Sequence, residues 1–115
     1  MGRLSTHVLD TSAGRPAAGV KVVLRRLDGG DAVIAEAVTN DDGRLDQALL
    51  DGPAFRPGRY ELTFHVGDYF RARGAPFANP AFLDVIPLRF GLSEDAQYPV
   101  PLLVSPYGYS TYRGG

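Results

Sequence analysis

Residues 60–66 read YELTFHV, and this stretch decides how the rest of the sequence is interpreted. Aromatic and aliphatic residues stand at every second position, and polar residues fill the positions between them. The apolar set is Tyr60, Leu62, Phe64 and Val66. A period of two is typical of a strand with one buried and one solvated face. The stretch therefore predicts a half-buried β-strand.

Similar short strands are predicted on both sides of this one. They are VKVVLRRL (20–27), AVIAEAVTN (32–40), FLDVIPLRF (82–90), YPVPLLV (98–104) and GYSTYR (108–113). Turn sequences such as DGGD, NDDG, FRPG and SPYG separate them. About seven or eight strands with frequent turns favour an all-β sandwich. One short helix is expected at GDYFRARG (67–74), with Asp68 as N-cap and Gly74 as its end.

The composition limits the classes of function that remain. The chain has 115 residues and no linker or repeat, so residues 1–115 are expected to form a single domain. A net charge of −1 and no basic stripe among the aromatic residues argue against nucleic-acid binding. The absence of cysteine excludes disulfides, thiolate metal sites and cysteine nucleophiles.

The cellular location is predicted from two further features of the sequence. No apolar run approaches the roughly 20 residues of a membrane helix. No basic and then apolar leader follows the first methionine. We therefore expect a cytoplasmic protein without a membrane partner.

Pro99 and Pro101 constrain the strand at 98–104. Alternate residues of a strand point their N–H groups to the same side, so two prolines at this spacing remove two donors from one edge. The start of this strand is therefore either a sheet edge or unpaired on that side.

Three residues with reactive side chains have ordinary structural interpretations when taken one at a time. A lone strand histidine such as His7 is more often a hydrogen-bonding structural residue than a catalyst. His65 lies on the polar face of its strand, which indicates a solvated side chain. Arg44 follows the turn NDDG and fits a solvated turn residue, or an arginine held there for anion or carbonyl binding. No metal-binding spacing and no P-loop, Rossmann or GxSxG motif is present.

Taken together, several stretches resemble one family. THVLD, GRPAAGV, TNDDGR, GRYELTFHVGDYF and VPLLVSPYGYSTYRG are similar to the transthyretin-like proteins, and in particular to the 5-hydroxyisourate hydrolases of purine catabolism. The resemblance runs from about residue 4 to residue 114. It implies a sandwich of two four-stranded sheets with a short helix. It also implies a homotetramer, a dimer of dimers, with active sites at the dimer–dimer interface lined by the first strand and the last two strands.

The implied reaction opens a cyclic amide of 5-hydroxyisourate and yields 2-oxo-4-hydroxy-4-carboxy-5-ureidoimidazoline, without cofactor or metal. By resemblance, His7 would orient or activate water, and Arg44 would bind a carbonyl or anionic edge of the purine-derived substrate. The terminal YRGS motif of the family corresponds to Tyr112, Arg113, Gly114 and Gly115, which we expect to bind substrate.

The sequence departs from the family at three positions. The family reads HYHVPLL where this chain reads QYPVPLL, so Gln97 and Pro99 replace two histidines, and Gly115 replaces the final serine. Pro99 occupies the position of the second catalytic histidine and is expected at the substrate site. Because proline cannot exchange a proton, a catalytically inactive ligand-binding protein is the alternative. A structural sandwich for protein contacts is a third interpretation.

Overall fold

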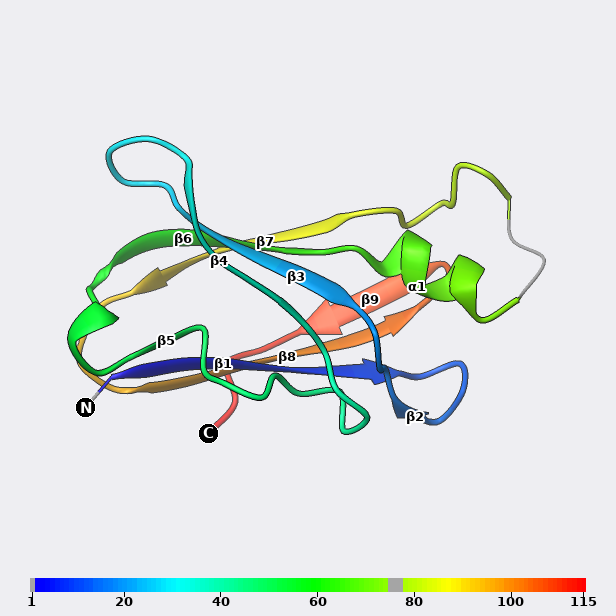
Figure 1. Cartoon of the computed structure of the whole chain (residues 1–115), viewed down its shortest axis with the longest axis horizontal. Coiled ribbons are helices and arrows are strands. Elements are labelled where there is room, and N and C mark those ends of the chain that lie inside the picture. Colours follow the sequence, from blue (N-terminus) through cyan, green and yellow to red (C-terminus); the bar gives the residue numbers. More distant parts are fainter. Residues whose placement is uncertain (1, 75–77) are drawn as a thin grey trace.

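The computed structural model describes residues 2–74 and 78–115 as two β-sheets packed face to face (Figure 1). The first sheet has the order β2-β1-β8-β9, and β5 also pairs with β1. Its strands are β1 (Arg3–Asp10), β2 (Arg15–Pro16), β5 (Leu50–Asp51), β8 (Gln97–Ser105) and β9 (Gly108–Thr111). The second sheet has the order β4-β3-β6-β7, and its strands are β3 (Lys21–Arg26), β4 (Ala32–Val38), β6 (Gly58–Phe64) and β7 (Ile86–Leu92).

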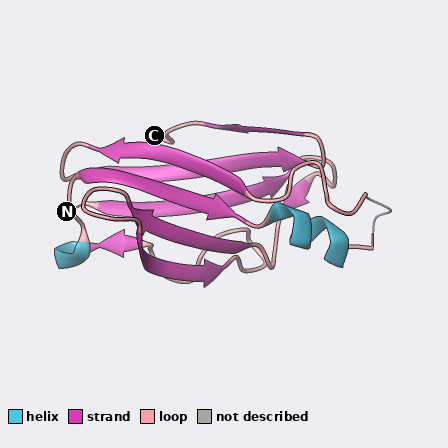
Figure 2. Ribbon diagram, turned by 90° about the horizontal axis from the view of Figure 1, so that it is seen from above, coloured by secondary structure: helices cyan, strands magenta, loops and turns pink. Residues whose placement is uncertain are grey.

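Two short helical segments lie at opposite ends of the sandwich (Figure 2). They are the α-helix α1 (Val66–Ala72) and the 3₁₀ turn η1 (Gly52–Ala54). The predicted sandwich with one short α-helix is confirmed, and β5 is an addition to the first sheet. Among the described residues, no helix is long and apolar enough to cross a membrane.

The core follows the alternation seen in the sequence. Tyr60, Leu62 and Phe64 are each at most 1% exposed, and they face buried side chains of the other sheet such as Leu4 and Leu102. Full burial of such a side chain stabilises the fold by about 1.5–3 kcal/mol. The predicted inward face of β6 is therefore confirmed as part of the second sheet's contribution to the core.

A parallel ladder between β1 and β8 organises the first sheet. It pairs residues 3–10 with residues 97–104 without a break, so that Ser5 lies opposite Pro99 and His7 opposite Pro101. Because side chains alternate, Leu4 and Val8 point into the core while Ser5 and His7 face outward. This register brings the predicted histidine beside the proline-rich strand.

Helix α1 begins earlier than predicted. It starts at Val66 after His65 in the N-cap position, so the N-cap role predicted for Asp68 is wrong. Val66, together with two aromatic residues of the helix, is buried, and this packing extends the helix back past Asp68. Asp68 instead lies in the first turn and pairs with Arg71. Gly74 follows the helix with a φ of 77°, which agrees with the predicted end.

The strand predicted at 82–90 begins later than expected. The ladder with β6 starts at Ile86, opposite Phe64. Just before it, the carbonyl of Asp84 accepts a hydrogen bond from the backbone N–H of Gly67 at 2.9 Å. Asp84 is therefore tied to the start of α1, residues 82–85 lie outside the sheet, and Phe82 is 73% exposed.

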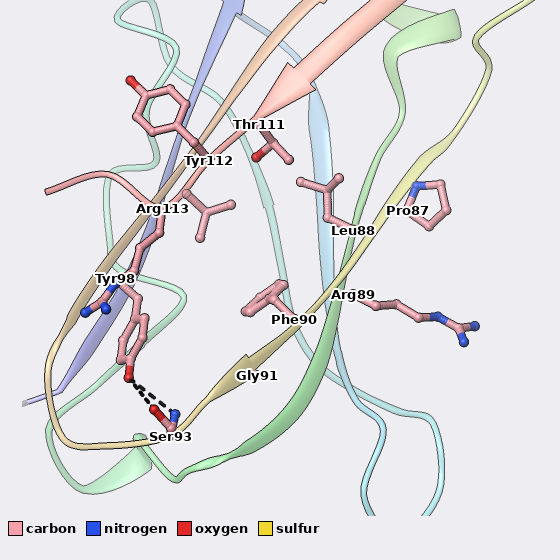
Figure 3. A pocket seen from close by; sticks show the side chains of 11 residues that line it. Pro87, Leu88, Arg89, Phe90, Gly91, Ser93, Tyr98, Thr111, Tyr112 and Arg113 are labelled. Atoms are coloured by element: carbon pink, nitrogen blue, oxygen red, sulfur yellow. Dashed lines mark hydrogen bonds between the residues drawn. The ribbon is translucent and has the colours of Figure 1, made fainter.

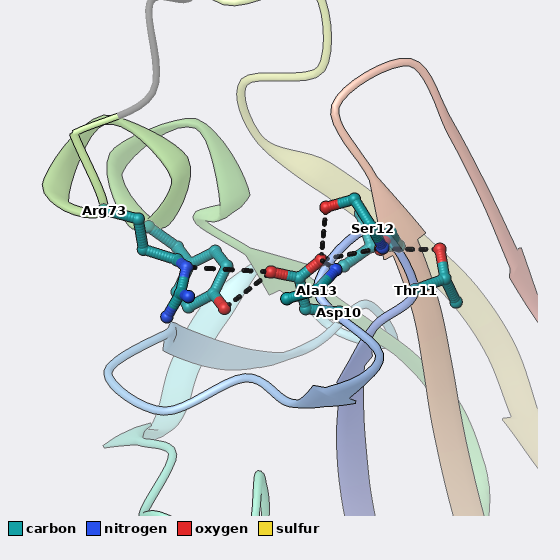
Figure 4. A network of polar contacts seen from close by, with 7 residues as sticks. Asp10, Thr11, Ser12, Ala13 and Arg73 are labelled. Carbon is teal, nitrogen blue, oxygen red and sulfur yellow. Dashed lines mark hydrogen bonds and ion pairs between the residues drawn. The ribbon is translucent and has the colours of Figure 1, made fainter.

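A buried carboxylate ties the end of β1 to the helix (Figure 4). Asp10 is 1% exposed, and it accepts hydrogen bonds from Ser12, from the N–H of Ala13 and from the hydroxyl of Tyr69 at 2.8 Å. The Nε of Arg73 lies 3.9 Å from the same carboxylate. Burial alone would raise the pKa of Asp10, but the hydrogen bonds more than offset it, so this pKa lies below its ordinary value.

We predict that Asp10→Asn lowers the free energy of unfolding by about 3 kcal/mol at pH 7, because it replaces the buried, charged acceptor of several hydrogen bonds. Urea unfolding measures this loss. Tyr69→Phe removes one of these bonds and should cost about 1–2 kcal/mol. Because the folded-state pKa of Asp10 is depressed, its contribution is present above 3.8, the ordinary value, and disappears as the pH falls through the folded-state pKa. Equal stability of Asp10→Asn and the unmodified protein would contradict this role.

Candidate functional site

The outer face of the first sheet carries the predicted histidine. Outward positions of β1 and β8 pair directly, so Ser5 and His7 lie beside Pro99 and Pro101. His7 is half-buried, although it points away from the core. Something besides the two strands must therefore cover it.

The NDDGR turn covers one side of His7. The side-chain oxygen of Asn40 accepts hydrogen bonds from the N–H groups of Asp42 and Arg44 at 2.9 and 3.2 Å, which closes the turn. The carbonyl of Gly43 accepts from the N–H of Val8 at 2.8 Å, and Arg44 forms a β-bridge with His7.

Gly43 is required at this point of contact with β1. Its φ is 72°, and a Cβ there would lie 2.3 Å from the carbonyl oxygen of Val8. The turn therefore needs glycine to bring Arg44 against His7.

The C-terminal segment covers the other side. β9 pairs with β8 only from Leu102 to Ser105, so the start of β8 has no strand ladder on that side, as its prolines predicted. Both proline carbonyls are used instead. The carbonyl of Pro101 accepts from the hydroxyl of Thr111 at 2.6 Å, and the carbonyl of Pro99 accepts from the N–H of Gly114 at 2.8 Å.

Gly114, the residue after Arg113, also has little room for a side chain. A Cβ on Gly114 would lie 3.1 Å from the ring of Pro99. The final residues are therefore ordered along β8 by the same prolines that exclude a regular strand.

These three segments enclose a cavity of about 200 Å³, which we call the His7 cavity. All the predicted site residues line it except Arg113. They are His7, Arg44, Pro99, Tyr112, Gly114 and Gly115. Ser5 and Pro101 also line it, and the sequence interpretation missed both. Their alternation with His7 and Pro99 was a signal that could have found them.

Arg113 lies on the other side of the sheet (Figure 3). Its guanidinium stacks over the ring of Tyr98, 4.2 Å from the centroid, and donates to the carbonyl of Gln97 at 3.1 Å. Together with Tyr98 it borders a separate, largely apolar cavity of about 460 Å³ between β7 and β9. Its contacts clamp the terminal segment to β8, and a contact between Arg113 and substrate stays a prediction.

The electrostatics of His7 favour a neutral ring. Burial and then the charge of Arg44 lower the pKa of His7, and together they outweigh the hydrogen bond to Asp42, which raises it. The Nε2 atom of His7 lies 3.0 Å from the carbonyl oxygen of Asp42. Since a carbonyl only accepts, Nε2 carries the proton and Nδ1 keeps the lone pair. The ring can therefore take a proton at Nδ1.

Metal binding is not indicated by the described residues. In residues 2–74 and 78–115, no three histidine, aspartate or glutamate side chains are grouped closely enough to hold an ion. His65 occupies the N-cap position of α1 without a side-chain capping hydrogen bond, and it does not line the His7 cavity. The candidate chemistry therefore involves His7, Arg44 and the terminal segment.

A β-sandwich with a polar site on the outer face of one sheet is the class that these observations define. The sequence profile of the HIUase/Transthyretin family matches residues 4–114, and the chain belongs to this family. It is 59% identical to the 5-hydroxyisourate hydrolase of Mesorhizobium japonicum over 98% of this chain and 92% of that protein.

Solved structures agree with this assignment. The structure of Klebsiella pneumoniae 5-hydroxyisourate hydrolase matches with a TM-score of 0.83 and 38% identity over the whole of both chains. A structure of (S)-allantoin synthase matches with a TM-score of 0.94 and 48% identity over 99% of this chain. This chain spans 44% of the length of that synthase.

We predict that His7 titrates below its ordinary pKa of 6.5. Proton NMR of a His65→Gln variant, in which His7 is the one remaining histidine, measures the midpoint. Arg44→Gln should raise this midpoint toward 6.5 because it removes the neighbouring cation. Arg89→Gln, which changes an arginine paired with Glu61 on the other sheet, is the matched control and should leave it unchanged. A midpoint above 6.5 in the His65→Gln protein would rule out a depressed pKa.

Proposed function

We propose that this protein hydrolyses 5-hydroxyisourate to 2-oxo-4-hydroxy-4-carboxy-5-ureidoimidazoline in urate catabolism. The observation that carries the proposal is one cavity in which His7, Arg44 and the terminal segment meet. The high identity to relatives named as 5-hydroxyisourate hydrolases supports the choice of substrate.

The proposed chemistry needs one base and one cation. Neutral His7 takes a proton from water at Nδ1, and the hydroxide adds to the ring carbonyl of the substrate. The guanidinium of Arg44 stabilises the oxyanion that forms. When the C–N bond breaks, the imidazolium of His7 returns its proton to the departing ring nitrogen. One histidine thus balances the protons, which is consistent with proline at position 99.

A ligand-binding protein without activity is the second candidate, and Pro99 is the observation that favours it. The ring of Pro99 lines the cavity and contacts the segment around Gly114, so the pocket keeps its shape. Loss of an acid–base group costs roughly 10²–10⁴-fold in rate. Both candidate functions therefore predict ligand binding, but only the hydrolase predicts turnover.

We predict that the unmodified protein accelerates the ultraviolet decay of 5-hydroxyisourate generated by urate oxidase. His7→Ala should lower kcat/KM by about 10²–10⁴-fold, because it removes the proton acceptor. The acidic limb of the pH profile of kcat/KM should lie below pH 6.5, since the pKa of His7 is depressed and its neutral form persists to lower pH.

Pro99→His and His65→Gln complete the design of this experiment. His65→Gln is the matched control, because His65 lies outside the cavity and its loss should leave the rate unchanged. If the unmodified protein shows only the spontaneous rate and Pro99→His is active, the chain is a binding protein on a hydrolase scaffold.

We further propose that the protein forms a homotetramer, a dimer of dimers, in the cytoplasm. Its support, besides the resemblance, is exposed apolar surface near the terminal strand. Tyr109 and Tyr112 are 46% and 60% exposed, and Leu103 is only half-buried on the outer face of β8. Such surface on a small chain is typical of an interface.

We predict that light scattering gives a mass four times that of one chain at micromolar concentration. Leu103→Glu should reduce the mass to that of a dimer, because it places a charge on the outer face that we expect to be covered. Glu36→Gln, on the exposed strand β4 of the other sheet, is the control and should leave the mass unchanged. A monomeric mass for fully active protein would overturn the proposed assembly.

A further inference from the structure

A second polar cavity adjoins the His7 cavity. It encloses about 250 Å³, and we call it the Arg3 cavity. Ser5, Thr6 and Arg44 line both cavities. Arg3 and Gln97 line only the second one. The proposed catalytic arginine is therefore a shared wall between two compartments.

The outward row of β1 connects the two cavities. Arg3 and Ser5 share a face of the strand with His7, and Arg3 pairs with Gln97 of β8 in the parallel ladder. At a rise of about 3.3 Å per residue, the Cα atoms of Arg3 and His7 are about 13 Å apart. Arg44 lies opposite His7 through its β-bridge. A ligand at His7 can thus extend along this row past Arg44 toward Arg3.

The charge of the Arg3 cavity is uncompensated. In the described part of the chain, neither Arg3 nor Arg44 forms an ion pair, although Asp51 lies opposite Arg3 in the ladder with β5. Among those residues, no aspartate or glutamate lines either cavity. A guanidinium without a carboxylate partner keeps its planar set of donors for an anionic ligand.

Two amide side chains complete the lining. Gln47 lies in the loop after Arg44, and Gln97 is on β8. The amide of Gln47 offers donors and an acceptor, a pattern that matches the N–H and C=O groups of a ureido group. The strand is also held at this point, because the carbonyl of Gln97 accepts from Arg113.

We propose that the Arg3 cavity is a binding subsite for a carboxylate that carries a ureido group, the chemical class of the ring-opened product. This identity of the ligand rests on the proposed function, because hydrolysis of the cyclic amide creates a carboxylate that the ring did not have. The carboxylate forms beside Arg44 and is bound by Arg3 as the ring opens. Arg3 therefore determines affinity for product, and His7 and Arg44 carry the reaction.

The test uses two small probes, ureidoacetate and its neutral amide, ureidoacetamide. Calorimetry measures their binding to the unmodified protein without substrate, and inhibition of 5-hydroxyisourate decay measures competition. We expect ureidoacetate to bind about five- to tenfold more tightly than ureidoacetamide, because the guanidinium of Arg3 forms charge-assisted hydrogen bonds with the carboxylate.

Arg3→Gln should abolish this preference, because it removes the guanidinium that we expect to bind the carboxylate. Arg3 is exposed and its backbone bond to Ala96 remains, so the variant should fold, which thermal unfolding checks. Arg15→Gln is the matched control, because Arg15 is exposed in β2 at the other end of β1, and it should keep the preference.

Two outcomes would overturn the subsite, namely equal binding of both probes or a preference that survives Arg3→Gln. The proposed function is tested independently of the subsite. If 5-hydroxyisourate decays at its spontaneous rate while the Arg3-dependent preference for ureidoacetate remains, the subsite stands and the hydrolase does not. If turnover is fast and the preference is absent, the hydrolase stands and the subsite does not.

Discussion

The parallel ladder between β1 and β8 is the interaction on which the rest of the structure depends. It joins residues near the two ends of the chain, and it sets which side chains of both strands face the core and which face outward. A shift of one residue would place His7 in the core and Val8 on the surface. Leu4 and Val8, which are fully buried, oppose such a shift because it would expose them. The register of the site is thus maintained by the hydrophobic core beneath it.

The site is built from three kinds of backbone irregularity around this regular ladder. Glycine at position 43 lets a turn approach β1, proline at 99 and 101 prevents a neighbouring strand from pairing along the start of β8, and Gly114 packs against the ring of Pro99. Each irregularity leaves backbone groups that a sheet would otherwise use. Here they hold the turn with Arg44 and the terminal segment in place. The turn and the terminal segment are therefore positioned by backbone contacts that do not depend on contacts between the reactive side chains.

Local pattern predicted the strands well where one face is buried, as in β6. It was less reliable where tertiary contacts decide the outcome. The helix extends back to Val66 because its apolar face is buried, and Asp84 bonds to the start of that helix instead of pairing with β6. The strand β4 was expected from its apolar residues, and it forms the edge of the second sheet, where Val33 and Ile34 are 48% and 43% exposed.

The resemblance to the family identified the site residues, but their relative positions could be determined only from the folded structure. Alternation along β1 can indicate which residues share a face with His7, but no local rule could show that the NDDGR turn lies against that face. The position of Arg113 on the opposite side of the sheet follows from the path of the terminal segment along β8. The Arg3 cavity likewise depends on a pairing between residues 94 positions apart, since Arg3 lies opposite Gln97.

The long separation of β1 and β8 also has a consequence for synthesis of the protein. Thr6 bonds to Val100 across 94 residues, so β1 has no permanent partner on that side until β8 has left the ribosome. Until then, its apolar residues are exposed in the nascent chain. Pairing of such distant segments is slow compared with local structure, because the loop must close before contacts form. The site on the outer face therefore forms late in folding. A chain released before residue 104 would contain His7 and Arg44 but would lack the complete strand β8 that lines their cavity.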